Sequence, residues 1–431
     1  RRCAACFAIR VCAAVSDRTP REISVDNARD RILAVFSVLP PENASIDEAL
    51  GRVVADGISA PVDSPAFTNS AMDGYALRAS DIDGASLSSV HIPVEAEVPA
   101  GSGESVRLTP GACVRIMTGA PLPVGADAVV PFELTTPHDD GRVSINAAVH
   151  AGANVRPAGE DFRIGETLID VGTRLGPAEI ALLASVGVTS LAIRRRPRVA
   201  ILATGDELVE PGAPRRSGQI WNANSPMLAS LVRGLGAEPV MFGIAGDASD
   251  ALTAWFDRAR ASEVDLLVTT GGVSAGDFDL VKQVMRAQGT FDEWRVRMRP
   301  GRPLAFGMIG ALPVLGLPGN PVAAFVSFVQ FARPAILKMQ GALPSDWLPP
   351  ELPVIVRDGI ENSGGRKTFA RVSVTRCAEG HEARLAGPQG SANLLTLSRA
   401  NGLLVIPEDV ERVQPGMRLT AQMPGWTFDM L

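Results

Sequence analysis

The chain has 431 residues, of which 46% are hydrophobic and 20% charged, and 41 basic against 47 acidic residues give a formal net charge of −6. This composition is typical of a soluble globular protein, and the length predicts about two to four domains. A net negative charge excludes a global basic field for nucleic acid or membrane surfaces, so any anion site must be built locally.

The cysteines and the apolar runs indicate where the protein works. The five cysteines are too few and too unevenly spaced for a disulfide scaffold, which favours a reducing compartment. The histidines are far apart and show no zinc-ligand spacing. No stretch reaches the roughly 18 to 20 uninterrupted apolar residues of a membrane span. We therefore expect a cytoplasmic protein with no membrane and no nucleic-acid partner.

The first half of the chain predicts two small domains, one inserted into the other. Residues 1–22 read as an unassigned extension. Helical patterning in "SVDNARDRILAVF" and "SIDEALGRVVA" is followed by short β-like runs, and helical patterning returns in "GPAEIALLASVG". We predict a discontinuous helical and extended linker domain, 23–64 and 162–196, that carries an inserted small β domain, 65–161.

The second half predicts an α/β domain followed by a β domain. From Arg198 strand and helix patterns alternate, which favours a doubly wound, parallel sheet with helices on both faces over 197–343. A Pro-rich linker, "ALPSDWLPP", follows. The remaining strand patterns, with no helix expected between them, predict a small β-barrel-like domain over 348–431.

Two strand ends of the α/β domain carry glycines, hydroxyls and carboxylates: "ATGDEL" (203–208) and "TTGGVSAGDFD" (269–279). Ligands bind at the carboxyl ends of the strands in such sheets, so both loops should face one cleft. Loops of this kind, where they precede a helix, let backbone N–H groups contact a phosphate. The sequence has no G-x-G-x-x-G, and "GIENSGGRKT" places Lys367 too late for a P-loop.

The stretch "WRVRMRPGRP" (294–303) supplies positive charge. Arg295, Arg297 and Arg299 recur at a period of two, so they share one face of an extended segment, and Arg302 follows a turn. A solvated, charged strand edge is one interpretation. An anion cradle is the favoured one, because guanidinium groups suit phosphate and other oxyanions.

A serine hydrolase is a weaker interpretation of the same region. The run from Gly272 to Gly276 matches the G-x-S-x-G nucleophile elbow, with Ser274 as the nucleophile. A triad of that fold needs a histidine downstream, and His381 in "CAEGHEARL" is the only one. Asp277 and Asp279 would also place negative charge beside an oxyanion that needs N–H donors. Ser274 is therefore predicted to be a loop hydroxyl.

Taken together, these motifs resemble the molybdopterin molybdenumtransferase family, which includes MoeA proteins and the gephyrin E domain. The resemblance extends from about residue 23 to the end of the chain and rests on long, unusual stretches. They are "NSAMDGYALR", "RIMTGAPLPVGADAVVPFE", "NVRPAGED", "ATGDEL", "GQIWNANS", "TTGGVSAGDFDLVK", "RPGRPLAFG", "GLPGNPVA" and "QGSANLLTLSRANGLLVIP".

The resemblance implies insertion of molybdenum from molybdate into adenylated molybdopterin, with cleavage of the adenylate and release of AMP. It implies Mg²⁺ as the cofactor, a homodimer with a composite site, and a molybdopterin adenylyltransferase and molybdoenzymes as further partners. Two alternatives from the same resemblance are a molybdopterin adenylyltransferase and a catalytically silent, gephyrin-like scaffold. The sister adenylyltransferases typically carry threonine and glycine where this chain has Val273 and Ser274, and they lack the flanking domains.

The family's functional residues can be placed on the matching motifs. The implied catalytic residues are Glu207, Asp206, Asp73 and Asp161. The implied substrate-binding residues are Thr118, Glu160, Asp247, Gly271, Gly272, Ser274, Asp279, Arg295, Arg299, Arg302, Pro318, Asn320, Arg371 and Ser391. The Mg²⁺ ligands would be Glu207, Asp247 and Asp279. Asp73, Thr118, Glu160 and Asp161 belong to the half-site that a second subunit provides.

Three departures from the family pattern are visible. Arg299 and Arg302 stand where relatives often have lysine, which keeps the charge but changes the geometry of the contact. Thr68 replaces an aspartate of some relatives. The first 20 residues have no counterpart in the resemblance.

Overall fold

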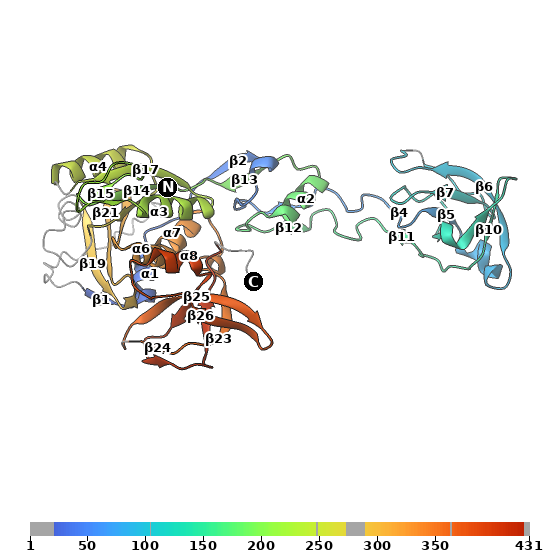
Figure 1. Ribbon diagram of the computed structural model, residues 1–431. Coiled ribbons are helices and arrows are strands. Elements are labelled where there is room, and N and C mark those ends of the chain that lie inside the picture. The colour runs from blue at the N-terminus through green and yellow to red at the C-terminus, as the bar shows by residue number, and fades with distance from the viewer. Residues whose placement is uncertain (1–20, 104, 247–248, 273–288, 363, 426–431) are drawn as a thin grey trace, which may run out of the picture.

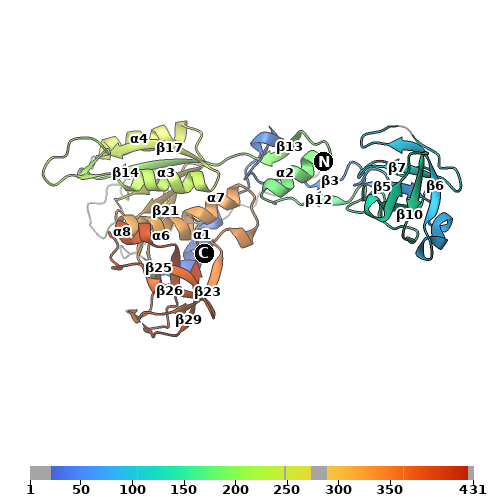
Figure 2. The same cartoon turned by 45° about the vertical axis from the view of Figure 1, so that its right-hand side comes forward.

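The computed structural model describes residues 21–103, 105–246, 249–272, 289–362 and 364–425. An α/β domain and a C-terminal β domain pack together at one end of an elongated molecule (Figure 1). A small linker domain follows, and an inserted β domain lies at the far end in both views (Figures 1 and 2). The predicted multidomain α/β and β class is confirmed.

The central sheet of the α/β domain has seven strands, and it is mixed and not purely parallel. Its order is β1 (Arg21–Ile23), β19 (Thr290–Val296), β21 (Pro303–Ile309), β22 (Leu312–Leu317), β18 (Leu266–Thr270), β14 (Arg198–Thr204) and β17 (Glu238–Ala245). The strands β22, β18, β14 and β17 run parallel, as predicted. The expected parallel arrangement fails at β21, because the short turn between β21 and β22 allows only an antiparallel pair.

Helices cover both faces of this sheet. One face packs against α1 (Val25–Leu33), α3 (Asn224–Gly234), α6 (Pro321–Ser327) and α7 (Arg333–Met339), and the other against α4 (Ser249–Ala261). A π-helical turn, Phe328–Ala332, joins α6 to α7 into one core helix. The run Pro321–Met339 is long and apolar enough to cross a membrane, but 89% of its window is buried inside the protein, as in a core helix.

The sequence predicts that the N-terminal elements belong to the linker domain, but the structure places them in the α/β domain. Strand β1 pairs with β19, and the buried side chains of α1 join the core of the α/β domain. The linker domain itself contains β2 (Pro41–Ser45) paired with β13 (Ser190–Arg194), β3 (Ile58–Ser59) paired with β12 (Thr167–Ile169), and α2 (Pro177–Ser185).

The helix expected in "SIDEALGRVVA" is wrong. Only a 3-10 turn, Ile46–Glu48, forms there. Gly51 has a φ of 73°, which ends the turn, and its N–H donates to Leu175 O at 2.8 Å. Val54 N donates in the same way to Thr173 O at 3.0 Å. These backbone N–H groups therefore bond to carbonyls of a distant segment and not to carbonyls one helical turn earlier.

The inserted β domain has a six-stranded sheet with an apolar core on each face. Along β5, Tyr75 and Leu77 face one core and Ala76 faces the other, as strand alternation requires. The sheet order is β8 (Ala128–Pro131), β5 (Gly74–Leu77), β7 (Cys113–Ile116), β6 (Val90–Val98), β10 (Arg142–Ile145) and β9 (Thr135–Pro137), with 3-10 turns at Ala79–Ser86 and Phe132–Leu134. A ribbon of β4 (Asn69–Ser70) and β11 (Val155–Arg156) lies on the side of the linker domain (Figure 1).

The C-terminal domain contains a closed, small β-barrel. Its order is β20 (Met298–Arg299), β25 (Lys367–Cys377), β26 (Gly380–Leu385), β23 (Glu351–Val356), β29 (Arg418–Gln422) and β27 (Gly402–Ile406), and β27 pairs back with β25. A ribbon of β24 (Ile360–Glu361) and β28 (Arg412–Val413) and a 3-10 turn, Pro344–Asp346, complete it. The expectation of no helix is wrong, because α8 (Leu394–Arg399) lies between β26 and β27.

Candidate functional site

Glycines line the carboxyl edge of the central sheet. Gly205 follows β14, Gly246 follows β17, and Gly271 follows β18. Gly271 has a φ of 91°, and a Cβ there would lie 2.5 Å from the carbonyl oxygen of Thr204, so only glycine fits this crossing. A Cβ built on Gly319, after β22, would lie 3.6 Å from Gly271 Cα, so these two glycines are neighbours. Gly205 is buried, Gly246 and Gly271 are partly exposed, and Gly319 is exposed. The strand ends therefore carry no side chain at these positions that would hinder a close approach by a ligand.

The turn Asp206–Glu207 lies on this edge, as predicted, and both side chains are exposed. The Glu207 carboxylate folds back towards Gly205, and Asp206 Oδ1 lies towards Gly246. No helix follows the turn. Instead β15 (Leu208–Val209) pairs with β16 (Ile220–Trp221), and Ile220 N donates to Glu207 O at 2.8 Å. Capping of a following helix is thus excluded as the role of either carboxylate.

Asn224, at the start of α3, ties this edge together. Its Nδ2 donates to Thr270 Oγ1 and to Gly319 O, both at 2.7 Å. Thr270 Oγ1 in turn donates to Pro318 O at 3.2 Å, so the ends of β18 and β22 and the start of α3 are fixed to one another. Sequence reasoning missed Asn224 as a site residue, although it lies in the quoted motif "GQIWNANS".

The remaining predicted residues of this edge are only partly described. Gly272 follows Gly271 with a φ of 65°. Asp247, Ser274 and Asp279 lie outside the described residues. Within the described ranges, no group of three or more His, Cys, Asp or Glu side chains is arranged to hold a metal ion. The two carboxylates of Asp206 and Glu207 nevertheless fit Mg²⁺, which is commonly bound by one or two carboxylates together with substrate phosphates and water.

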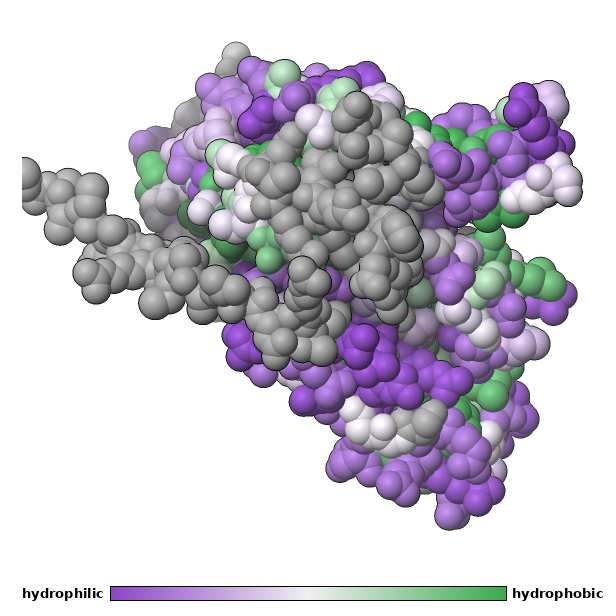
Figure 3. All heavy atoms as spheres, turned by 90° about the vertical axis from the view of Figure 1, so that its left-hand side faces the viewer, coloured by the Kyte–Doolittle hydropathy of each residue, from purple (hydrophilic) through white to green (hydrophobic). Residues whose placement is uncertain are grey.

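A second recess, of about 340 Å³, opens where the α/β domain meets the C-terminal β domain. It brings together Arg299, Arg302, Pro318, Asn320 and Ser391, all of which were predicted. Its other lining residues are Met298, Pro300, Gly301, Pro303, Ala323, Arg366, Gln389 and Gly390. We call it the arginine pocket, because three guanidinium groups and no carboxylate are among these lining residues. Figure 3 shows strongly hydrophilic side chains on this end of the molecule, towards the C-terminal domain.

The basic stretch "WRVRMRPGRP" divides between two environments. Its alternation is confirmed, because Trp294, Val296 and Met298 are buried and the arginines lie on the other face. Arg299 reaches the arginine pocket because β20 pairs with β25 of the barrel, placing it opposite Thr368. Arg295 is not among the described lining residues. Its strand lies between β1 and β21, away from that pairing.

Arg371 is buried and binds the loop that contributes Gly390 and Ser391 to the arginine pocket. It is 2% exposed, its Nη2 donates to Gly390 O at 3.0 Å, and its Nε has no described partner. Burial, and then the nearby charge of Arg299, lower the pKa of Arg371 to about 10. Gln389 fixes the same loop, because its Oε1 accepts from Arg371 N at 2.8 Å and its Nε2 donates to Arg371 O at 3.0 Å. The loop that carries Ser391 is thereby held in place.

Arg366 is a pocket residue that sequence reasoning missed. It lies in the basic, glycine-rich run "GGRKT", whose lysine comes too late for a P-loop. The sequence shows only another arginine next to a strand. Arg366 comes close to Arg299 because β20 pairs with β25, about 70 residues away in sequence.

Asp73 and Thr118 are brought into contact in the inserted β domain. Asp73 Oδ1 accepts from Thr118 N and from Thr118 Oγ1, both at 2.7 Å. These hydrogen bonds, first from the backbone and then from the hydroxyl, lower the pKa of the exposed Asp73 carboxyl. Asp73 is thus held as a carboxylate with the rest of its oxygen surface open to a ligand.

Glu160 and Asp161 follow β11, the second strand of the β4–β11 ribbon, in the chain. Both are exposed, and Asp161 N donates to Ser64 O at 2.9 Å. The register of β4 with β11 places them beside the start of the segment that leads to Asp73. The linker domain separates this half-site from the sheet edge of the same chain in both views (Figures 1 and 2). The structure therefore groups the predicted residues into three places: the sheet edge, the arginine pocket and the inserted domain.

Comparison with known families covers almost the whole described chain. Residues 23–187 match the MoeA N-terminal region (domain I and II), residues 200–338 match a probable molybdopterin binding domain, and residues 353–422 match the MoeA C-terminal region (domain IV).

Individual relatives agree with these matches. The chain is 40% identical to molybdopterin molybdenumtransferase 2 of Mycobacterium tuberculosis over 92% of its length and 98% of the relative's. It is 34% identical to molybdopterin molybdenumtransferase of Haemophilus influenzae, covering 93% of this chain and 98% of that one. The crystal structure of the molybdopterin biosynthesis MoeA protein from Pyrococcus horikoshii superimposes with a TM-score of 0.80 at 29% identity, covering 94% and 100% of the two chains. The chain belongs to the molybdopterin molybdenumtransferase family and is an enzyme of molybdenum cofactor biosynthesis.

Proposed function

We propose that this enzyme transfers molybdenum from molybdate to adenylated molybdopterin, cleaving the adenylate and releasing AMP. One observation carries the proposal: the arginine pocket adjoins the glycine-lined sheet edge at the segment Pro318–Asn320. Pro318 and Asn320 line the pocket, and Gly319 between them lies against Gly271 of the edge. A tetrahedral oxyanion in the pocket and a phosphate ester on the edge would therefore be neighbours.

The chemistry of each place suits one substrate. Molybdate is a small dianion, and the guanidinium groups of Arg299, Arg302 and Arg366 would donate hydrogen bonds to it, with Arg302 exchanging its 3.5 Å ion pair with Glu22 for the oxyanion. The glycines at the strand ends carry no side chains, which would allow the phosphates of an adenylate to approach the backbone of the connecting loops closely. Holding both reactants side by side converts an encounter of two molecules into a reaction within one complex.

The carboxylates of Asp206 and Glu207 would hold Mg²⁺ against the phosphates, with Asp247 and Asp279 as further ligands implied by the family. When bound, the ion would neutralise charge that develops as the phosphoanhydride breaks. Without a cation, two exposed carboxylates at this turn would repel the substrate. Their role is thus to fix the position of the phosphates and of the attacking oxygen relative to the arginine pocket.

The complete site is proposed to form across a homodimer. Asp73, Thr118, Glu160 and Asp161 lie on the inserted domain, apart from the sheet edge of their own chain (Figure 1). In a twofold dimer each inserted domain would instead complete the edge of the other chain. The enzyme would work in the cytoplasm, receiving adenylated molybdopterin from an adenylyltransferase and passing the finished cofactor to molybdoenzymes.

The alternatives predict different products. An adenylyltransferase would consume a nucleotide and would not need the arginine pocket, and a silent scaffold would release no AMP. A serine hydrolase would need Ser274, outside the described residues, to meet His381, which lies on β26 of the barrel opposite Arg376. Incubation of the wild-type protein with adenylated molybdopterin should release AMP only when molybdate and Mg²⁺ are both present. Absence of molybdate-dependent AMP would contradict the proposed reaction.

Arg299→Ala should raise the apparent KM for molybdate by about 10-fold or more, because charge-assisted hydrogen bonds to an oxyanion contribute about 1.5 to 3 kcal/mol each. The affinity for adenylated molybdopterin, measured by fluorescence titration, should change little. Arg295→Ala is the matched control, since Arg295 lies on the same stretch but is not among the described lining residues of the arginine pocket. Equal effects of the two substitutions would contradict the assignment of the pocket to molybdate.

A further inference from the structure

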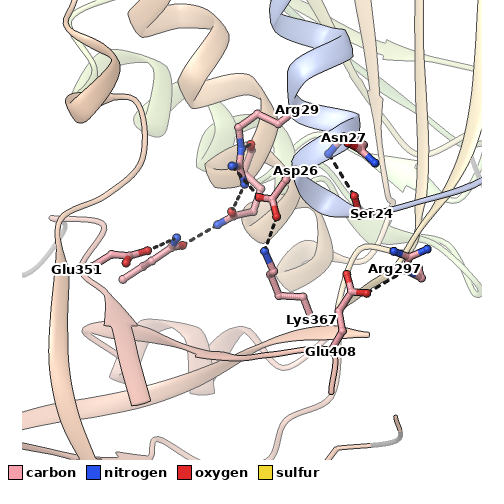
Figure 4. A network of polar contacts seen from close by, with 10 residues as sticks. Ser24, Asp26, Asn27, Arg29, Arg297, Glu351, Lys367 and Glu408 are labelled. Carbon is pink, nitrogen blue, oxygen red and sulfur yellow. Dashed lines mark hydrogen bonds and ion pairs between the residues drawn. The ribbon is translucent and has the colours of Figure 1, made fainter. Parts of the chain in front are cut away.

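A chain of buried amide groups joins the core helix of the α/β domain to the C-terminal barrel (Figure 4). Gln330, 1% exposed, lies in the π-helical turn, and its Nε2 donates to Gln422 Oε1 at 2.7 Å. Gln422, 3% exposed, ends β29, and its Nε2 donates to Glu351 Oε1 at 3.2 Å. We call this chain, with Arg29, the amide relay.

Arg29 of α1 binds the other side of Gln330. Its Nε donates to Gln330 O at 3.1 Å and its Nη2 donates to Gln330 Oε1 at 3.2 Å. A carbonyl is available for Arg29 Nε because the π-helical turn interrupts the regular hydrogen bonding of the helix, a feature found often at functional sites. Each polar atom of the Gln330 side chain is therefore satisfied from a different element, α1 or the barrel.

The same helix α1 contacts the barrel a second time. Asp26 Oδ2 accepts from Lys367 Nζ at 2.8 Å, and Lys367 begins β25, the strand that pairs with β20. Figure 4 shows α1 above the barrel strands, with Asp26 and Arg29 both directed towards this junction. A further pair, Arg297 Nε with Glu408 Oε2 at 3.0 Å, closes the same junction beside it. Asp26 Oδ1 also accepts from Arg29 Nη1 at 3.1 Å, so one connected network of directional bonds joins the barrel to the α/β domain.

The two elements that this network joins, the core helix and the barrel, also form the walls of the arginine pocket. The core helix begins at Asn320 and Ala323, which line the pocket, and continues to Gln330. The opposite wall, with Arg299, Arg366 and Ser391, belongs to the barrel, because β20 pairs with β25. Val322 N donates to Ser391 O at 3.0 Å across the boundary. The width of the pocket is therefore the separation of two domains, and a shift of the barrel along the core helix would change it.

We propose that the amide relay is a positioning device for the arginine pocket: Gln330 sets the placement of the barrel so that Arg299, Arg366 and Ser391 stand at the correct distance from Arg302 and Asn320. This rests on the proposed function of the pocket. A buried amide group without a hydrogen-bond partner destabilises the protein, and hydrogen bonds are directional. The relay therefore restricts sliding of the barrel along the core helix more than apolar contacts do, because those are not directional. None of its members lines the pocket, so Gln330 acts through the barrel and not on molybdate.

Gln330→Met keeps the size and shape of the side chain but removes the relay. The apparent KM for molybdate should rise by about 10-fold, because errors of about 1 Å in placement cost about 100-fold in the reaction of bound groups. The affinity for adenylated molybdopterin at the sheet edge should change less than about 2-fold, since that edge belongs wholly to the α/β domain. Arg29→Met, at the partly exposed end of the relay, should shift KM in the same direction if Gln330→Met folds poorly.

Gln340→Met is the matched control. Gln340 is also a buried glutamine of the core helix, accepts from Arg174 Nη2 at 2.9 Å, and donates to Leu235 O at 2.8 Å. Its bonds lead to the linker domain and to α3, and not to the barrel. The substitution should lower the melting temperature as Gln330→Met does and leave the KM for molybdate unchanged.

The relay can also be rebuilt with its direction reversed. Gln330→Glu alone places a carboxylate oxygen next to Gln422 Oε1, so two acceptors face each other. If the Gln422 amide flips and donates to the new carboxylate, its oxygen faces the Glu351 carboxylate instead, and two acceptors again face each other. The double variant Gln330→Glu with Glu351→Gln lets every bond form again, with the amide of Gln422 reversed. Its KM for molybdate should return to within about 3-fold of wild type, a recovery expected if the relay's geometry sets the pocket.

The outcomes separate the two proposals. If Gln330→Met and Arg29→Met keep the wild-type KM for molybdate, the positioning role of the relay is overturned. It is also overturned if Gln340→Met raises this KM as much as Gln330→Met does. Neither result contradicts the assignment of the arginine pocket to molybdate. Failure of the double variant to recover, when it folds, also overturns it. If the wild-type protein neither binds molybdate in a calorimetric titration nor releases AMP with it, the proposed function fails and the relay's role fails with it.

Discussion

Glu207→Ala should fold, assemble and bind adenylated molybdopterin as the wild type does, yet lose molybdate-dependent AMP release by about 100-fold or more, as expected when reacting groups are misplaced. The side chain is exposed, so its removal should change the free energy of unfolding by less than about 0.5 kcal/mol. Its backbone carbonyl, which accepts from Ile220 N, is retained in the variant. The measurement is the initial rate of AMP release at saturating molybdate and Mg²⁺.

The physical reason lies in the position of the Glu207 carboxylate. It folds back towards Gly205 at the end of β14, where the proposed phosphates would lie against the glycine edge. The turn leads into β15 and not into a helix, so the carboxylate has no capping role that would explain its presence. A smaller loss is expected for Asp206→Ala, whose carboxylate lies towards the neighbouring strand end at Gly246.

Glu210→Ala is the control for this experiment. Glu210 is an exposed carboxylate just beyond β15 in the same connection, so it tests the general effect of removing a negative charge there. Its rate should stay within about 2-fold of wild type, as for a surface substitution away from the site. A folded Glu207→Ala variant with the wild-type rate would remove Glu207 from the chemistry.

The placement of Asp206 and Glu207 at a strand end was predictable because its signal is local. Buried runs such as "RVAILAT" end in glycine and carboxylates within a few residues, and parallel strands bring such ends to one edge. The alternation of arginines and buried residues around Met298 was readable for the same reason. Both signals depend on spacing within one element, which a single sequence records directly.

The missed features all depend on contacts between distant segments. Strand β1 has only three residues and exists because it pairs with β19, far along the chain. Arg366 reaches the arginine pocket through the pairing of β20 with β25, whereas Arg295, equally basic, does not. Gln330 is an amide in an apolar helix whose partners, Arg29 and Gln422, come from opposite ends of the sequence. No local pattern distinguishes these residues from their neighbours.

Mixing two inactive variants, Asp73→Ala and Glu207→Ala, should restore AMP release to about a quarter of the wild-type rate, because random exchange between dimers gives one half heterodimers, each with one intact site of two. Asp73 lies on the inserted domain and Glu207 on the sheet edge, and the linker domain separates them within one chain (Figure 1). Removing Asp73 should leave the fold intact, since Thr118 N and Oγ1 are at an exposed position where water can replace the carboxylate. Light scattering should show that each variant and the mixture are dimers.

The matched control for the mixture is Asp206→Ala with Glu207→Ala. Both residues lie on the same turn, so in every heterodimer each site would take its sheet edge from one defective chain, and the rate should not rise above the mean of the two variants measured separately. Recovery in the first mixture and not in the second requires that one chain supplies the sheet edge and the other supplies Asp73. Absence of recovery after subunit exchange has been verified by native mass spectrometry, or full activity of a stable monomer, would show instead that each chain completes its own site. That result would require the inserted domain to fold back across the linker domain, because exposed Met72 and Asp73 otherwise have no described contact with the sheet edge of their own chain.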